Sequence, residues 1–463
     1  MPHHDLVIVG SGSGNSVVTE DLEDLDIALV DEGVFGGTCL NVGCIPTKMF
    51  IVPADRVVEA GAAARLGVST TPAEVDWRAV RDRVFGRIDP ISAHGEEYRR
   101  EQSSVTLYRT RARFTGDRTL QLDTGEVLTA DRVVVAVGSR PVTLPVDGLR
   151  AVDPGRGVHT SDTVMRMDAL PRRMVVVGGG FVACEMAHVF AAFGVEVTQV
   201  QRSSRLLVRE EEAVGERYTA VARERHDLRL DSTVTAAARH GSAWRLTVAG
   251  PAGTDEVEAE AVLLAVGRRP NSDLVDAAAG GVETHSDGRV VTDAEQRTTA
   301  PGVWALGDVA SADQLKHVAN HEARIVAHNL AVDLGRAPGP PARQDGRPVP
   351  HAVFGYPQVA SFGPTAAQLD AAGTPYVSAT EAVGDVAYGW ALEDTTGFLT
   401  VHASPDGRVL AAHCIGPHAS SIIQPLIQAA SLGQRAHEVA RGQYWIHPAL
   451  AEVVENALLG LSA

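Results

Sequence analysis

The sequence predicts an α/β protein with two Rossmann-like dinucleotide-binding domains and an α+β C-terminal domain. Two glycine-rich turns predict the nucleotide domains, because each follows a strand of continuous apolar residues and precedes a second such strand. Segments in which apolar and polar residues alternate predict the strands of the third domain. A length of 463 residues is compatible with this organisation, since domains average about 150 residues.

Composition and charge disfavour several classes of protein. The apolar fraction of 44% is ordinary for a soluble globular protein. The formal net charge of −17 disfavours a nucleic-acid partner, which requires a basic face on the protein. The sequence contains no apolar run of about 18 residues that could span a bilayer, and the N-terminus lacks a secretory signal pattern. We therefore expect a cytoplasmic protein with neither a membrane nor a nucleic-acid partner.

The first glycine-rich turn follows the apolar residues 6–9. Its glycines have the spacing that lets a backbone approach a pyrophosphate: Gly10, Gly12 and Gly14. A second strand at 27–30 ends in Asp31, and an acidic residue at this distance can bind the hydroxyls of a ribose. Asn15 replaces the last glycine of the pattern, so we expect looser packing of the helix that follows. The turn predicts a site for FAD or NAD.

The second glycine-rich turn follows residues 174–177 and precedes an apolar helix and the strand 195–200. The positions that define it are Gly178, Gly180 and Ala183. No acid ends this strand, and Arg202, Arg205 and Arg209 follow it instead. A ribose 2′-phosphate needs cationic partners and is repelled by a carboxylate. The second turn therefore predicts an NADPH site.

Three further apolar strands end in glycine, which suits a close passage of backbone beside a nucleotide domain. They are residues 132–137 before Gly138, 262–266 before Gly267, and 302–306 before Gly307. Asp308 follows the last of them and could accept hydrogen bonds from a polyol such as a ribityl chain. An ordinary turn aspartate is the alternative interpretation of this residue.

The order of these elements predicts how the domains follow one another. We expect the first nucleotide domain at 1–155, the second at 156–275, the remainder of the first at 276–345, and the C-terminal domain at 346–463. Residues 336–350 are rich in proline and glycine and predict a linker. Alternating strands at 398–402 and 409–413 and a helical run at 421–428 come after it. The last domain has no nucleotide motif, so it could be an assembly surface.

Cys39 and Cys44 are the strongest functional signal in the sequence. Residues five apart on a regular helix face away from each other, so joining the two sulfurs requires a distorted turn. Gly43 and Pro46 could permit such a turn. A strained local disulfide is easily reduced and closes only a short loop, so it suits redox chemistry better than stabilisation.

The other two cysteines, Cys184 and Cys414, lie far along the chain in apolar segments. A zinc site would need two further ligands beside Cys39 and Cys44, and no partner lies at metal-ligand spacing. We therefore expect no metal site, and we interpret Cys184 and Cys414 as inert core thiols.

His447 and Glu452 form a candidate acid–base pair near the C-terminus. A residue before proline is disfavoured in helical conformation, so His447 is expected on an extended or turn segment. Pro448 can start the helix that carries Glu452, whose carboxylate could then fix the tautomer of the imidazole. A purely structural histidine is the alternative, since the chain contains 17 histidines. The cysteine pair favours a functional role, because thiolate chemistry needs an acid–base partner.

Taken in order, these segments resemble the pyridine nucleotide–disulfide oxidoreductases, the family of glutathione reductase and dihydrolipoamide dehydrogenase. The resemblance runs from the first glycine-rich turn to the segment that ends at Glu452. Five segments are most similar to members of the family that reduce mycothione: residues 38–50, 84–90, 315–324, 384–390 and 441–448.

The resemblance implies an enzyme that uses NADPH and FAD to reduce a small-molecule disulfide. Mycothione is the expected substrate. It implies a homodimer in which His447 of one subunit serves the active site of the other, and a cis peptide between His447 and Pro448. Lys48, one of only two lysines in the chain, is implied to pair with Glu185 beside the flavin.

The resemblance also implies roles in the thiol chemistry. Cys44 is the expected thiolate on the flavin side, and Cys39 is the expected nucleophile toward the substrate. His447, oriented by Glu452, would protonate the departing thiol. The residues implied to bind the cofactors are Gly10, Gly12, Gly14, Asp31, Glu32, Gly37, Thr38, Lys48, Gly138, Gly178, Gly180, Ala183, Arg202, Arg205, Gly267 and Asp308.

Three other functions remain open from the sequence. One is an NAD-dependent dihydrolipoamide dehydrogenase, which usually carries an acid where Gln201 stands. Val208 leaves cofactor preference open as well, since relatives that prefer NADPH often have an arginine there. The others are an NAD(P)H oxidase or quinone reductase with a sensor disulfide, and a non-catalytic flavoprotein. Residues 84–100, including Arg99, are a further candidate for a wall of the substrate pocket.

Overall fold

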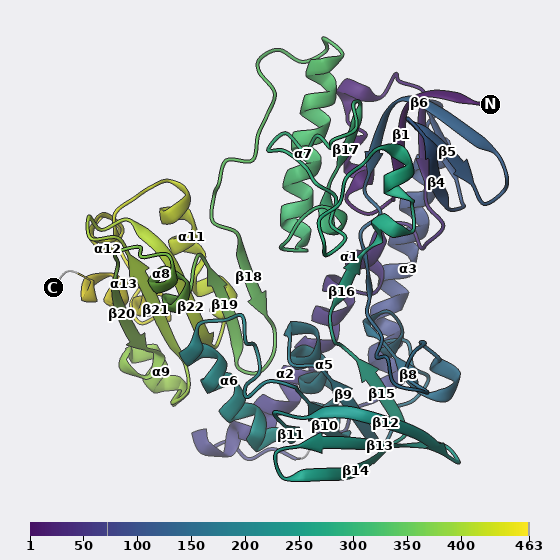
Figure 1. Ribbon diagram of the computed structural model, residues 1–463. Coiled ribbons are helices and arrows are strands. Elements are labelled where there is room, and N and C mark those ends of the chain that lie inside the picture. The colour runs from purple at the N-terminus through teal and green to yellow at the C-terminus, as the bar shows by residue number, and fades with distance from the viewer. Residues whose placement is uncertain (72, 462–463) are drawn as a thin grey trace. The chain divides into compact units, whose positions relative to one another are not determined.

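The computed structural model describes residues 1–71 and 73–461, which form α-helices and β-sheets (Figure 1). The chain folds into two compact units, each assembled from three separate stretches of sequence. The first unit comprises residues 1–46, 82–142 and 268–346, and the second comprises residues 47–81, 143–267 and 347–463. The domain boundaries expected at residues 155, 275 and 345 stay predictions.

A seven-stranded sheet forms the centre of the first unit. Its strands are β1 (His3–Val9), β2 (Ile27–Val30), β3 (Val105–Tyr108), β4 (Ala112–Gly116), β5 (Thr119–Leu122), β6 (Val127–Val135) and β17 (Val303–Ala305). Strands β3, β2, β1, β6 and β17 are parallel, whereas β4 and β5 add an antiparallel edge. A short antiparallel pair, β7 (Ser139–Pro141) and β16 (Arg268–Pro270), belongs to the same unit.

Apolar side chains cover both faces of the seven-stranded sheet, which explains the continuous apolar runs in its parallel strands. Leu6 and Ile8 pack on one face with α7 (Lys316–Asp333). Val7 and Val9 pack on the other face with residues of β4 and β5. Figure 1 shows α7 running alongside β17 in this unit. The predicted strand–turn–strand order at the start of the chain is confirmed.

The segment after the first glycine-rich turn differs from the expected helix. It forms two short 3-10 helices, Gly14–Val17 and Glu20–Leu22, and residues 10–26, all described, contain no α-helix. The buried guanidinium of Arg99 donates to the side-chain oxygen of Asn15 at 2.6 Å and to its carbonyl at 2.8 Å. The carbonyl of Asn15 therefore accepts its hydrogen bond from a side chain and not from the backbone of an α-helix. Arg99, considered above as a pocket wall, is a structural residue of the turn.

The second unit contains the second glycine-rich turn in a five-stranded parallel sheet. In spatial order its strands are β11 (Asp227–Arg229), β10 (Glu196–Val200), β9 (Arg173–Val177), β15 (Ala261–Leu264) and β8 (Val158–His159). Two longer helices, α5 (Phe181–Ala192) and α6 (Glu212–Arg225), belong to this region. An antiparallel sheet of β12 (Thr233–His240), β13 (Ala243–Gly250) and β14 (Gly253–Ala259) is inserted before β15. The second predicted strand–turn–helix–strand is confirmed.

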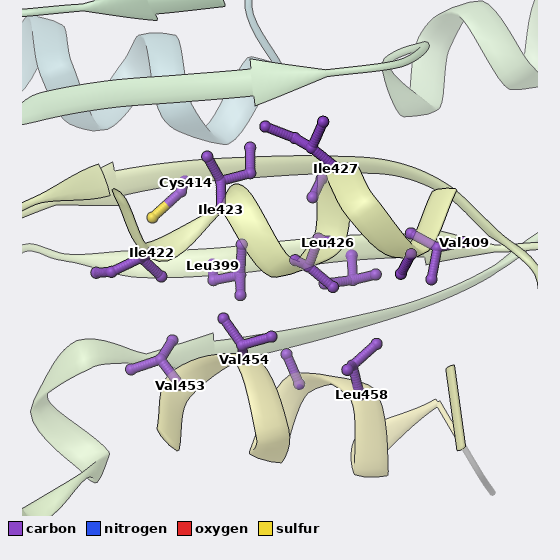
Figure 2. Packing of buried hydrophobic residues seen from close by; sticks show 14 of the residues in the cluster. Leu399, Val409, Cys414, Ile422, Ile423, Leu426, Ile427, Val453, Val454 and Leu458 are labelled. Carbon is purple, nitrogen blue, oxygen red and sulfur yellow. The ribbon is translucent and has the colours of Figure 1, made fainter. Parts of the chain in front are cut away.

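The C-terminal part of the second unit is an antiparallel sheet with helices. Its strands, in spatial order, are β18 (Pro350–Val353), β19 (Gln358–Phe362), β22 (Val409–Gly416), β21 (Phe398–Ala403) and β20 (Val377–Ala382). Figure 2 shows Leu399 and Cys414 of this sheet among side chains of α10 (Ala419–Ile422), α11 (Gln424–Ser431) and α13 (Glu452–Gly460). The predicted α+β character of this domain is confirmed.

The remaining helices are α1 (Gly37–Asn41), α2 (Cys44–Ala62), α3 (Trp77–Glu101), α4 (Ser161–Val164), α8 (Ala366–Ala371), α9 (Ala387–Leu392) and α12 (Ala436–Arg441). Residues 336–349 contain neither helix nor strand, as expected for the linker. Of the helices in residues 1–71 and 73–461, none is long and apolar enough to cross a membrane.

Candidate active site

Cys39 and Cys44 are brought together by a break between two helices. Cys39 lies in α1 and Cys44 is the first residue of α2, so the expected distortion is an interruption at residues 42–43. Gly43 makes the close passage possible, because a Cβ atom there would lie 2.9 Å from the carbonyl oxygen of Thr38 and 3.3 Å from Cα of Cys39. Any larger residue would push the two helices apart at this point.

Cys39 and Cys44 are not joined by a disulfide in the structure. The hydrogen bond with Cys44 is the largest cause that raises the pKa of Cys39, followed by burial, whereas the charge of Lys316 acts in the opposite direction. The proton of Cys39 is therefore held more firmly than that of an ordinary thiol. Cys44 begins the 19-residue helix α2, where the helix dipole favours a thiolate.

The first glycine-rich turn packs directly against the cysteine segment. Gly10 has a φ of 113°, and a Cβ atom there would lie 2.2 Å from the carbonyl oxygen of Ala136. Gly37 in α1 has a φ of 70°, and its Cβ atom would lie 2.7 Å from Cα of Gly12. Both positions therefore require glycine. This contact places the cysteine motif next to the turn, which sequence separation alone could not show.

The acidic residues after β2 have different surroundings. Asp31 accepts the backbone N–H of Ser11 at 2.6 Å and that of Gly33 at 2.7 Å, so its carboxylate is fixed beside the turn. Glu32 instead forms an exposed ion pair with Arg111. Asp31 thus has the fixed position that a ribose contact needs, and Glu32 is engaged elsewhere.

Asp308 is held in the same unit by residues that the sequence did not single out. Its carboxylate accepts a hydrogen bond from the hydroxyl of Ser139 at 2.7 Å, and Arg268 donates to the same hydroxyl at 2.8 Å. Glu322, buried in α7, accepts the N–H of Gly307 at 2.7 Å and thereby fixes the turn that carries Asp308. Burial raises the pKa of Glu322 to about 7. No local motif marks Glu322, because its role depends on the packing of α7.

The second glycine-rich turn has the geometry of a phosphate-binding turn at a helix N-terminus. Gly178 has a φ of 134°, and its Cβ atom would lie 2.2 Å from the carbonyl oxygen of Ala265. Gly180 immediately precedes α5, and a Cβ atom there would enter open space. Ala183 is fully buried in the first turn of α5. Gly267, with a φ of 126°, likewise faces open space.

The three arginines after β10 differ in availability. Arg202 is exposed, and within residues 1–71 and 73–461 its side chain has no recorded ion pair. Arg205 contacts the carboxylate of Glu212 at 3.5 Å and the carbonyl of Val208 at 3.4 Å, and its side chain is only 23% exposed. Arg209 is exposed. Arg202 and Arg209 are thus better placed than Arg205 to receive an anionic group.

Lys48 and Glu185 form the expected ion pair in the second unit. The Lys48 ammonium lies 2.8 Å from both oxygens of Glu185, and the two side chains are 33% and 3% exposed. The backbone N–H of Phe354 donates to the same carboxylate at 2.8 Å. The ammonium also lies 4.7 Å from the centre of the Phe354 ring, within range of a cation–π contact.

His447 is presented as the sequence suggested, with one difference. The His447–Pro448 peptide is cis, and Nδ1 of His447 lies 2.7 Å from Oε1 of Glu452. The pKa of Glu452 is lowered, and the hydrogen bond from His447 is the largest cause of this shift. The expected helix start at Pro448 is wrong, because α13 begins at Glu452, whose second oxygen accepts the N–H of Ala449 at 3.1 Å. The His447 side chain is 70% exposed, so Nε2 is accessible.

The two other cysteines are buried, as expected. Cys184 lies within α5 and Cys414 within β22. Burial raises the pKa of each thiol to about 12, so both stay protonated at neutral pH. The remaining expected cofactor positions, Gly14, Thr38 and Gly138, lie in the first unit.

Comparisons with known proteins agree with this site. Residues 4–324 match the family described as pyridine nucleotide-disulphide oxidoreductase, and residues 349–458 match its dimerisation domain. The chain is 48% identical to mycothione reductase of Mycobacterium tuberculosis, over 100% of both chains. It is 33% identical to dihydrolipoyl dehydrogenase of Halobacterium salinarum, over 98% of this chain and 95% of that protein.

Solved structures show the same fold. The HOCl-induced flavoprotein disulfide reductase RclA from Escherichia coli has a TM-score of 0.83 and 23% identity, over 98% of this chain and 99% of that chain. The Cu(II) complex of the same protein has a TM-score of 0.84 and 24% identity, over 97% of this chain and 98% of that chain.

Family members use FAD and a nicotinamide dinucleotide, and the residues of this chain fit both cofactors. Gly10 and Gly178 hold backbone conformations that bring each turn close to its neighbouring strand end. The open space beside Gly180 and the exposed Arg202 suit a phosphorylated ribose. From its fold, its cysteine pair and these full-length matches, the chain belongs to the pyridine nucleotide-disulphide oxidoreductase family and is an FAD-dependent disulfide oxidoreductase.

Proposed function

We propose that this chain catalyses the NADPH-dependent reduction of mycothione to mycothiol in the cytoplasm. The observation that carries the proposal is 48% identity to a mycothione reductase over the whole of both chains. The sulfurs of Cys39 and Cys44, on the segment beside the first glycine-rich turn, would supply the redox centre that this reaction needs. A reducing compartment suits the activity, since the product is a thiol.

The cofactors have separate places in this proposal. The NADPH phosphate is assigned to Arg202, with Arg209 as the second cation. The first turn, Asp31 and Asp308 are assigned to FAD. When bound, FAD relays two electrons from NADPH to the Cys39–Cys44 disulfide. We assign Lys48, oriented by Glu185, to the surroundings of the bound flavin, as the family resemblance implies, where its positive charge would favour reduction of the flavin.

The thiol steps follow from the chemistry of the two sulfurs. After reduction, Cys44 carries the thiolate and Cys39 keeps its proton until His447 removes it. The Cys39 thiolate attacks one sulfur of mycothione, and a mixed disulfide forms while the first mycothiol leaves. His447, held by Glu452, returns the proton to that leaving thiolate. Cys44 then attacks Cys39, which restores the disulfide and releases the second mycothiol as a thiolate that takes a proton from solvent.

The dimerisation domain indicates that the chain acts as a homodimer. We assign His447 to the active site of the other subunit, as the family resemblance implies. The exposed imidazole and its neighbours Tyr444 and Ile446, whose side chains are also exposed, support this assignment. Apolar side chains so exposed on a single chain are typical of a surface that a partner covers.

Parallel turnover measurements test the proposed function. The purified protein is assayed with NADPH and with NADH against mycothione, oxidised glutathione and lipoamide, and Cys39→Ser is the control for the thiol route. The proposal predicts that NADPH with mycothione gives the highest kcat/KM and that Cys39→Ser abolishes turnover. Higher kcat/KM with NADH and lipoamide would favour a dihydrolipoyl dehydrogenase, the activity named for the 33% identical relative.

A further inference from the structure

A buried cluster of one carboxylate and two imidazoles lies in the second unit, apart from the groups used above. It consists of Glu211, at the start of α6, His402 on β21 and His413 on β22. A carboxylate oxygen of Glu211 and one ring nitrogen of each histidine lie within 4.8 Å of one another. We propose that Glu211, His402 and His413 bind one divalent transition-metal ion of the zinc type.

The distances between these groups suit a cation better than direct hydrogen bonds. Oε2 of Glu211 lies 3.6 Å from Nε2 of His402 and 3.8 Å from Nε2 of His413. Both separations exceed the usual hydrogen-bond range. Ligands about 2.1 Å from a tetrahedral zinc ion are roughly 3.4 Å apart. The two distances to Glu211 are close to this spacing, whereas the ligand atoms of the two histidines, which lie within 4.8 Å of each other, would have to approach for three ligand bonds to form.

His402 is already oriented as a metal ligand. The side chain is 2% exposed, and its Nδ1 lies 2.7 Å from the hydroxyl of Ser378. Its Nε2 atom is buried and has no hydrogen-bond partner among the residues that the structure describes. A ligating histidine commonly uses its other ring nitrogen for an outer hydrogen bond that fixes its tautomer, and Ser378 fills that place.

His413 is 1% exposed and faces the same carboxylate. Its Nε2–H donates a hydrogen bond of 3.2 Å to the carbonyl of Pro364, and its Nδ1 has no hydrogen-bond partner in the described part of the chain. A cation would bind the Nε2 lone pair in place of that hydrogen bond, and the ring proton would move to Nδ1.

The charge balance of the cluster also suits a cation. The ion pairs recorded for Glu211 in the described part of the chain join it to the two histidines alone. Its Oε2 atom is fixed by the N–H of Ala366 at 2.9 Å. Adjacent Glu210 adds a second buried carboxylate, held by His351 and Ser361. Buried negative charge is stabilised by a bound cation.

No sequence motif marks this cluster, because its members lie on segments far apart in the chain. Alternation in β21 explains the geometry: Leu399 and Val401 belong to the apolar core, whereas His402 lies on the other face of the strand. The bound ion would connect the segment of Arg202–Glu211 to the C-terminal sheet. Its expected effect is on stability, since no redox step involves it.

Zinc binding to the intact holoenzyme tests the proposal. The full-length oxidised protein, without an affinity tag and carrying Cys39→Ser and Cys44→Ser to remove thiol ligands, is stripped with chelator and titrated with Zn²⁺. Bound zinc is measured by mass spectrometry after gel filtration, and its ligands by X-ray absorption. We expect about one zinc per chain with nitrogen and oxygen ligands only. No retained zinc would mean that water fills the cluster, and the proposal would be overturned.

Variants locate the ion. His402→Gln and Glu211→Gln should each lose the bound zinc and the rise in melting temperature that zinc causes. Ser378→Ala should weaken binding by about tenfold, because it removes only the outer hydrogen bond. His437→Gln, an exposed histidine on α12, is the matched control and should bind like the parent. Equal zinc binding by Glu211→Gln and the parent, with FAD content unchanged in both, would place the ion elsewhere and overturn the proposal.

Discussion

Oε1 of Glu452 lies 2.7 Å from Nδ1 of His447, while the other oxygen of Glu452 accepts the backbone N–H of Ala449. The carboxylate is thus fixed at both oxygens, and it fixes the imidazole in turn. Because Nδ1 is occupied, proton transfer is left to the exposed Nε2 atom. The pair has the arrangement of an oriented acid–base catalyst.

Glu452→Gln should lower kcat by about tenfold, and His447→Gln by about 100-fold or more. The amide of the Glu452→Gln variant can still contact Nδ1, but it cannot stabilise the imidazolium by charge. The measurement is kcat with mycothione. Glu455→Gln, on the same helix, is the control; a loss of activity there as large as in Glu452→Gln would contradict a specific role for Glu452.

Gly43→Ala should destabilise the cysteine segment, since its Cβ atom would lie 2.9 Å from the carbonyl of Thr38. We expect a loss of about 2 kcal/mol in unfolding free energy and slower reduction of the Cys39–Cys44 disulfide by NADPH. Gly86→Ala is the matched control, because Gly86 lies in α3 with open space around its Cβ position. Chemical denaturation and stopped-flow absorbance measure the two effects. Equal unfolding free energies and equal reduction rates for the two variants would contradict a steric requirement for glycine at position 43.

Arg202→Ala should raise KM for NADPH by about 10- to 100-fold, as expected for the loss of a charged hydrogen bond, and leave KM for NADH nearly unchanged. The reason is that only NADPH carries the 2′-phosphate. Steady-state kinetics with both nucleotides measure the difference. Arg223→Ala, an exposed arginine on α6, should change neither constant. An equal rise in both KM values for Arg202→Ala would show that Arg202 does not recognise the phosphate.

Lys48→Ala should leave the nearly buried carboxylate of Glu185 with the N–H of Phe354 as its one partner among residues 1–71 and 73–461. We expect a loss of about 2 kcal/mol in stability, smaller than for a fully buried pair because Lys48 is 33% exposed. The double variant Lys48→Ala with Glu185→Ala should be more stable than Lys48→Ala alone, since it removes the unpaired charge. Thermal unfolding of the three variants measures this coupling, and strict additivity would contradict it.

The buried carboxyl of Glu322 predicts a pH-dependent stability. Burial raises its pKa to about 7, above the unfolded value near 4.5, so the folded state binds the extra proton between these values. Its stabilising effect is present below pH 4.5 and is lost as the pH rises through 7, a change of about 3 kcal/mol. Melting temperatures of the parent and Glu322→Gln between pH 5 and 8 measure it. A parallel pH dependence of both proteins would exclude Glu322 as the cause.

Much of the fold could be predicted because its determinants are local. Continuous apolar runs such as residues 174–177 specify buried parallel strands, and Gly10 and Gly178 mark turns where the backbone must pass close to a neighbour. The cysteine pair and the His447–Glu452 pair could also be found, because each lies within a short segment.

The features that the sequence did not reveal depend on distant contacts. Arg99 donates to the carbonyl of Asn15, where 3-10 turns stand in place of the expected α-helix. The hydrogen bond from the N–H of Gly307 to the carboxylate of Glu322 forms only because α7 packs beside the turn. The cluster around Glu211 requires two neighbouring strands and a loop from another part of the chain.

The central claim is that electrons from NADPH reach a disulfide between Cys39 and Cys44. The most direct test is a count of free thiols in the denatured protein, before and after anaerobic addition of one NADPH per chain to the oxidised holoenzyme. We predict two thiols before reduction, from Cys184 and Cys414, and all four afterwards. A count that stays at two while the NADPH is consumed would contradict the account.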